Sequence, residues 1–162
     1  MHPVNDVDAL VLLSTALSSK RRPAELTEII AGAELLNTTI PSEAKLIESF
    51  ERLAVHDLIR QQGDGYTLTP AAEAMVAELP RKAAAEERLF IIRDNLTTYT
   101  AGALQAAIVL DAAQVGAAIA THQAAAKEAS KNLLVPKPKP EAGPSRPGQR
   151  ARKPMPPRKR KV

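Results

Sequence analysis

The sequence predicts a mainly α-helical protein with one small β-hairpin. Apolar residues recur at helical spacing along most of the first 132 positions, which favours a set of amphipathic helices. A single stretch, "IRQQGDGYTL", breaks this pattern and has glycines on both sides of an aspartate, as tight hairpin turns require. Only four residues are aromatic and none is cysteine, so we expect an aliphatic core without disulfides.

Two helices are predicted before residue 37. Val7, Leu10, Val11, Ser14 and Leu17 lie on one helical face, and Asn5 or Asp6 is placed to cap the first turn. After the basic stretch "SSKRRP", Pro23 fits the first turn of a second helix that runs to about Leu36.

A third helix is predicted after the polar turn "NTTIPS", with Ser42 as its N-cap. Its apolar residues, expected to face inward, are Leu46, Ile47, Phe50, Leu53 and Ala54. Its expected outward residues are Glu43, Lys45, Glu48, Ser49, Glu51, Arg52, Val55 and His56. This helix is the best patterned of the three.

The hairpin strands are predicted at about 58–62 and 66–69. Thr69 then caps a short fourth helix with Pro70 in its first position, and Pro80 ends or kinks that helix. Two further helices are expected, at 82–98 and, rich in alanine, at about 103–132. We therefore predict a folded domain over 5–79, a helical extension over 81–132, and a tail over 133–162 that is disordered because it is rich in proline and basic residues.

Charge is distributed unevenly along the chain. The formal net charge is +4, but from residue 136 onward ten basic residues face only Glu141, which gives this segment +9. The first 135 residues therefore carry −5. An acidic body is joined to a basic tail, and the two parts have different expected partners.

The order helix, helix, turn, helix, hairpin, helix resembles that of winged helix-turn-helix domains. The segment "SEAKLIESFERLAVHDLIRQQGDGYTLTPAAEAMVAEL" is similar to the third helix, wing and following helix of that superfamily. The stretch "LNTTIPS" also resembles a group of uncharacterised bacterial winged-helix proteins. The resemblance covers about residues 6–79. It implies that the third helix enters the DNA major groove and that the hairpin, as the wing, lies on the phosphate backbone.

The candidate nucleic-acid-binding residues lie in both parts of the chain. In the domain they are Lys20, Arg21, Arg22, Lys45, Ser49, Arg52, His56 and Arg60, and in the tail they are Arg150, Arg152, Lys153, Arg158, Lys159, Arg160 and Lys161. The third helix is net acidic, which opposes phosphate binding, so we expect the tail to supply most of the affinity. Each of these groups also has an interpretation without nucleic-acid binding: a solvated charged loop at 20–22, an exposed face of the third helix, and a tail that only increases solubility. A nuclear-localisation signal in "PPRKRKV" is a weaker alternative.

Two functions remain open from sequence. The first is a small cytoplasmic nucleic-acid-associated protein, such as a transcriptional regulator or a nucleoid-associated factor. The second is a winged-helix protein-interaction module that forms a homodimer through small residues of the alanine-rich helix. Those residues are Ala106, Ala113, Gly116 and Ala117.

Other function classes find no support in the pattern. The three histidines are scattered, and no metal, phosphate-loop or nucleophile motif is present, so we expect no enzyme, metal, cofactor or small-molecule substrate. The N-terminus lacks a basic region before its apolar run, so we expect no signal peptide. The most apolar window, 101–120, contains Asp111 at its centre, which argues against a membrane span.

Overall fold

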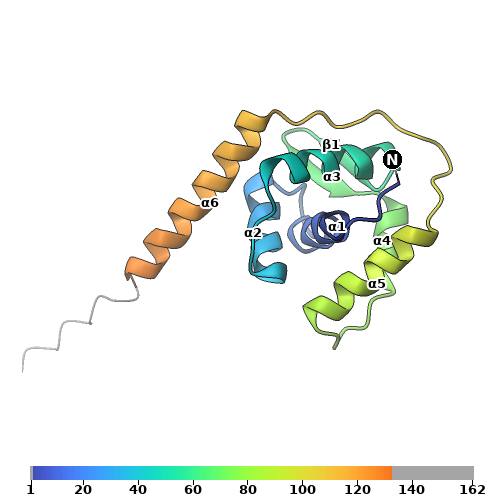
Figure 1. Cartoon of the computed structure of the whole chain (residues 1–162), viewed down its shortest axis with the longest axis horizontal. Coiled ribbons are helices and arrows are strands. Elements are labelled where there is room, and N and C mark those ends of the chain that lie inside the picture. The colour runs from blue at the N-terminus through green and yellow to red at the C-terminus, as the bar shows by residue number, and fades with distance from the viewer. Residues whose placement is uncertain (1, 133–162) are drawn as a thin grey trace, which may run out of the picture.

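The computed structural model describes residues 2–132, and in this range it confirms a mainly helical protein with a small hairpin (Figure 1). The helices are α1 (Asp6–Ser18), α2 (Leu26–Asn37), α3 (Glu43–Val55), α4 (Pro70–Ala77), α5 (Ala85–Thr98) and α6 (Ala112–Asn132). The strands are β1 (Ile59–Gln62) and β2 (Gly65–Leu68). The predicted tail, 133–162, lies outside the described residues.

Helix α1 is the centre of the fold. It contacts α2, α3, α4, α5 and β2, and Figure 1 shows it end-on with the other elements around it. Every residue from Asp8 to Thr15 is buried, so α1 is enclosed on all sides rather than on the one predicted face. Its buried hydroxyls, on Ser14 and Thr15, both donate to the carbonyl of Val11.

The hairpin is antiparallel, with Ile59 opposite Leu68 and Gln62 opposite Gly65. Tyr66 also exchanges two backbone hydrogen bonds of 2.8 Å with Ala24, so the segment before α2 adds an isolated bridge beside β2. This corrects the expected start of α2. Pro23 lies before the helix, because residues next to it are extended for pairing with β2, and α2 begins only at Leu26.

The alanine-rich helix is shorter than predicted. It begins at Ala112 rather than at 103, and residues 101–111 form no regular helix or strand. In this segment Ile108 and Leu110 are buried whereas Val109 between them is exposed. Such alternation is typical of extended chain, and it lets both residues reach the core where a helix would turn them apart. Helix α5 likewise begins at Ala85, three residues later than predicted.

The two predicted parts of the folded region share one core. The buried cluster unites α1 and α3 residues such as Leu12 and Phe50 with Ile92 and Leu96 of α5, and with Val115 of α6. The helical extension therefore packs on the first 79 residues as part of the same body. Within residues 2–132, no helix combines the length and apolar character that crossing a membrane requires.

Candidate nucleic-acid interface

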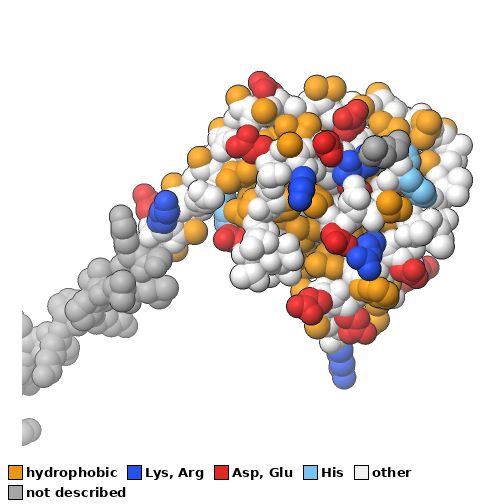
Figure 2. Space-filling model, in the orientation of Figure 1, with side chains coloured by type: hydrophobic (Ala, Val, Ile, Leu, Met, Phe, Trp, Pro, Cys, Tyr) orange, Lys and Arg blue, Asp and Glu red, His pale blue; other side chains and the backbone are white. Residues whose placement is uncertain are grey.

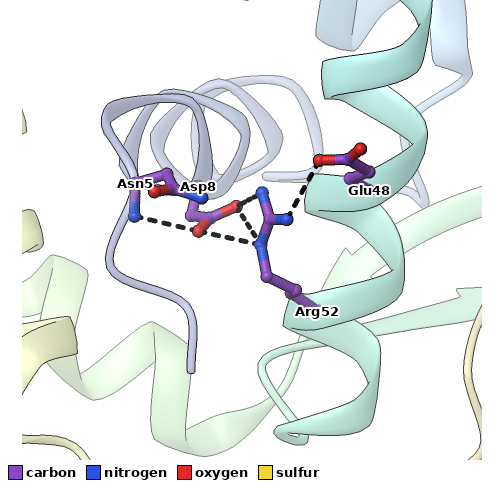
Figure 3. Close-up of polar contacts among 4 residues, drawn as sticks. All are labelled: Asn5, Asp8, Glu48 and Arg52. Atoms are coloured by element: carbon purple, nitrogen blue, oxygen red, sulfur yellow. Dashed lines mark hydrogen bonds and ion pairs between the residues drawn. The ribbon is translucent and has the colours of Figure 1, made fainter. Parts of the chain in front are cut away.

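Arg52 was predicted to be an exposed cation on α3, and the structure instead places it inside the protein. Its Nη2 lies 2.9 Å from Oδ1 of Asp8, and its Nε lies 3.2 Å from each oxygen of that carboxylate (Figure 3). The Asp8 side chain is fully buried and that of Arg52 is 9% exposed. Arg52 is thus committed to an ion pair between α1 and α3 and has no role on the surface.

The surroundings of this ion pair satisfy most of its polar atoms. The backbone N–H of Asn5 donates to Oδ2 of Asp8 at 3.0 Å, which closes the first turn of α1, and Glu48 accepts from Nη1 of Arg52 at 3.4 Å. Burial by itself lowers the pKa of Arg52, but the hydrogen bonds and charge of Asp8 and then of Glu48 outweigh it, so the pKa is raised. The guanidinium therefore stays charged in the interior.

Two other members of the expected α3 stripe are also withdrawn from solvent. Ser49 is fully buried, and its hydroxyl has no hydrogen-bond partner among the described residues. His56 is half-buried and stacks on His2, with ring centroids 5.4 Å apart. Burial, followed by the nearby charge of His2, lowers the pKa of His56, which favours the neutral ring. The prediction that Ser49 faces outward was wrong, because its side chain is buried. His56 remains partly exposed, and His2 near the N-terminus covers one face of its ring.

The cations of the hairpin and of the loop before α2 are exposed but partly engaged. Arg60 donates to Asp57, with Nη2 3.0 Å from Oδ1. Arg22 binds Glu28 at 2.6 Å, whereas Lys20 and Arg21 make no ion pair within the described part of the chain. These pairs reduce the positive charge that the domain presents to a phosphate.

Asp57 has an unusual backbone conformation that ends α3. Its φ of 55° lies in the left-handed region that favours glycine. Here the N–H of Leu58 donates to Leu53 and that of Asp57 to Ala54, which is the hydrogen-bond pattern of a Schellman motif. This motif ends α3 and turns the chain into β1, and the bond to Arg60 holds the Asp57 side chain beside it.

The part of α3 that remains exposed is net acidic. Its exposed charged residues are Glu43, Lys45, Glu48 and Glu51, three carboxylates against one ammonium. No continuous positive surface runs from Lys20 across Lys45 to Arg52, because Arg52 is buried. Counterion release needs lysine and arginine at the phosphates, and this face offers only Lys45.

The chain after α5, residues 99–116, lies against both ends of α3. The N–H of Gln105 donates to the carbonyl of Val55 at 2.9 Å, and Tyr99 Oη donates to that of His56 at 3.2 Å. At the other end, a Cβ built on Gly116 of α6 would lie 3.0 Å from Oε1 of Glu43. Figure 1 shows the intervening segment passing along α3 before α6 begins. A recognition helix contacts bases with its N-terminal residues, and here α6 lies against that end.

No match to this chain was found among protein-family models, curated proteins or solved structures. The tail candidates, from Arg150 to Lys161, lie outside the described residues. Of the predicted domain residues, the structure thus leaves Lys20, Arg21 and Lys45 as exposed cations without an ion pair in residues 2–132.

Sequence reasoning missed Asp8 as the partner of Arg52. Asp8 occupies the third position of α1, where an aspartate is ordinarily explained by helix capping. The two residues are 44 positions apart, and no local spacing signals their contact. Among residues 2–132 there is also no group of three or more histidine, aspartate or glutamate side chains that could hold a metal ion.

Proposed function

We propose that this protein associates with nucleic acid through its basic C-terminal segment, and that α3 does not read bases. The observation that carries the proposal is the separation of charge: +9 after residue 135 and −5 before it. A segment of this kind binds polyanions by counterion release, without sequence preference and with strong salt dependence.

The arrangement of the folded part supports a winged-helix ancestry for the domain. The order α1, α2, α3, β1, β2 and the short pairing of Ala24 with β2 agree with the helix, helix, helix and wing order of that superfamily. A fold does not fix a function, however, and the site has to carry that. In this chain the acidic, covered α3 favours a role for the domain in orientation or partner binding rather than in groove recognition.

The test is the binding of duplex DNA as a function of salt. We would compare the full chain with a truncation after Val135 and with a full-length variant in which the seven tail candidates, Arg150, Arg152, Lys153, Arg158, Lys159, Arg160 and Lys161, become glutamine. We expect the full chain to bind with a steep salt dependence. Both altered proteins should lose most of the affinity and most of the slope, because the slope scales with the number of neutralised phosphates.

A matched control addresses the domain. Lys20→Gln with Arg21→Gln removes two exposed cations from the folded body and should change DNA binding little. If the truncated chain binds as well as the full chain, the affinity resides in the domain and the tail assignment is wrong. If the full chain does not bind DNA even at low salt, the nucleic-acid proposal fails altogether.

Self-association is a second candidate function, favoured by the outer half of α6. Residues 123–129 of this helix are all exposed, and Figure 1 shows α6 extending away from the body. An isolated helix of this kind is only marginally stable in water, so a helical partner would stabilise it. Of the expected contact residues, Ala113 and Ala117 are exposed on α6, Gly116 lies against α3, and Ala106 precedes the helix. Light scattering over a wide concentration range tests the idea, and a strictly monomeric chain rejects it.

A further inference from the structure

A cleft of about 600 Å³ opens on the side of the molecule where α1 and α3 begin. Its walls are the start of α1, the turn 37–42, the first turn of α3 and the first part of α5. Ligand sites in proteins commonly enclose about 300–1,000 Å³. The cleft therefore has the volume of a small-molecule site, and nothing in the proposed nucleic-acid function uses it.

Half of the residues that line the cleft are apolar, and the other half are polar or charged. Leu10 is buried at its base, Val7, Ile40 and Leu89 are half-buried, and Phe90 is 60% exposed. Figure 2 shows hydrophobic side chains on this face, with acidic and basic side chains around them. An apolar ligand body lying against the exposed Phe90 ring would remove apolar surface from water, which favours binding.

Four charged residues border the cleft, and two of them form an ion pair with each other. Arg93 is held by Asp6, with Nη1 2.6 Å from Oδ1, and its guanidinium lies 5.3 Å from the centre of the Phe90 ring. Lys45 and Glu86 make no ion pair within residues 2–132. Lys45 lies in the first turn of α3, where the helix dipole disfavours a cation, whereas Glu86 lies in the first turn of α5, where the dipole already favours an anion. An added negative charge is therefore better accommodated here than an added positive one.

We propose that this cleft binds a small amphipathic anion, with an apolar body between α1 and Phe90 and a carboxylate paired with Lys45. Arg93 holds one side of the Phe90 ring in place, and Leu10 and Ile40 contact the body of the ligand. The site is independent of the tail, so its failure and the failure of nucleic-acid binding are separate outcomes.

The experiment is an NMR titration of the full chain with decanoate, kept below its micelle concentration. Decanol and decyltrimethylammonium serve as neutral and cationic probes of the same chain length. The basic tail attracts any anion, so the readout is the set of backbone amides at 7–10, 39–45 and 86–93. We expect saturable shifts confined to these amides, strongest for decanoate and weakest for the cation.

Three variants identify the contacts. Lys45→Gln should weaken decanoate about tenfold, the effect of losing one charge-assisted hydrogen bond, and should leave decanol unchanged. Phe90→Ala should weaken both probes, and because Phe90 is exposed the fold should be retained. Lys20→Gln removes an exposed cation outside the cleft and should leave both affinities unchanged.

Several results would overturn the proposal. Shifts spread over the whole surface would mean that there is no site. Equal binding of decanoate to the wild type and to Lys45→Gln would remove the anion assignment, and tighter binding of the cationic probe would point to Glu86 instead. The fold of each variant is checked by its own spectrum without ligand.

Discussion

Arg52 of α3 and Asp8 of α1 form a buried ion pair, with Nη2 2.9 Å from Oδ1 and both side chains at least nine-tenths enclosed. Removing one partner leaves the other charge buried without compensation, which typically costs about 3–5 kcal/mol. We therefore expect Arg52→Met to lower the free energy of unfolding by roughly that amount. Urea unfolding followed by circular dichroism measures it.

The matched control for Arg52 is Glu48→Gln, which removes the exposed partner of the same guanidinium. This change should cost less than about 1 kcal/mol, as exposed ion pairs do. The double change Asp8→Leu with Arg52→Met should cost clearly less than the sum of the two single changes. An Arg52→Met protein as stable as Glu48→Gln would show that the pair does not hold α1 on α3.

Gly65 is expected to be intolerant of any side chain. A Cβ at this position would lie 2.7 Å from the Cβ of Pro23 and 2.9 Å from its backbone carbon, where β2 passes the segment before α2. We expect Gly65→Ala to destabilise the fold by about 1–3 kcal/mol, as overpacking does. Gly102→Ala is the control, because nothing lies within 4 Å of its added Cβ. Thermal unfolding of the two variants compares them, and equal midpoints would contradict this close approach.

The His2 and His56 stack makes stability depend on pH. Burial and then the charge of His2 lower the pKa of His56 below its ordinary 6.5. The unfolded chain therefore binds more protons just below pH 6.5, so stability is full above that pH and falls as the pH drops toward the folded pKa. Ring-proton NMR should show His56 titrating below the ordinary imidazole pKa of 6.5. In His2→Asn the His56 pKa should rise. An unchanged His56 pKa in this variant would mean that His2 does not influence it.

Attachment of α6 should depend on Val115, which is fully buried beside Ala118. An aspartate there cannot stay charged in the core without a large cost, so we expect Val115→Asp to detach α6 while α1 to α5 remain folded. Amide hydrogen exchange should show lost protection in residues 112–122. Ala117→Asp places the same charge on the exposed side of the helix and should keep protection. Similar exchange in both variants would mean that α6 is not held through Val115.

A contact between side chains also links α6 to α2. His122 lies with Nε2 2.5 Å from Oε2 of Glu34, on the side of α6 that faces the body. Glu34→Gln should therefore raise amide exchange in the same part of α6, by less than Val115→Asp does, because an exposed pair contributes little. Unaltered exchange in this variant would mean that the contact between His122 and Glu34 does not help to hold α6.

Much of the secondary structure follows from local chemistry. The Gly-Asp-Gly turn predicts the hairpin, since glycine adopts the φ of +62° at Gly63 without strain. Thr69 and Pro70 predict the start of α4, and the structure confirms that the Thr69 hydroxyl accepts from the N–H of Ala72. These features depend on neighbouring residues alone. The extended segment before α6 was missed because alanine favours a helix there, and tertiary burial of Ile108 and Leu110 overrides that preference.

The sequence by itself determined the helices, the hairpin and the separation of an acidic body from a basic tail, because periodicity, turn chemistry and charge are local properties. Only the tertiary structure decided which α3 residues are available. It buried Arg52 against Asp8, 44 residues away, and it placed residues 99–116 against α3. It also brought α1, α3 and α5 together around the cleft at Phe90. Such contacts join residues far apart in the chain, and their energy depends on packing that no local pattern specifies.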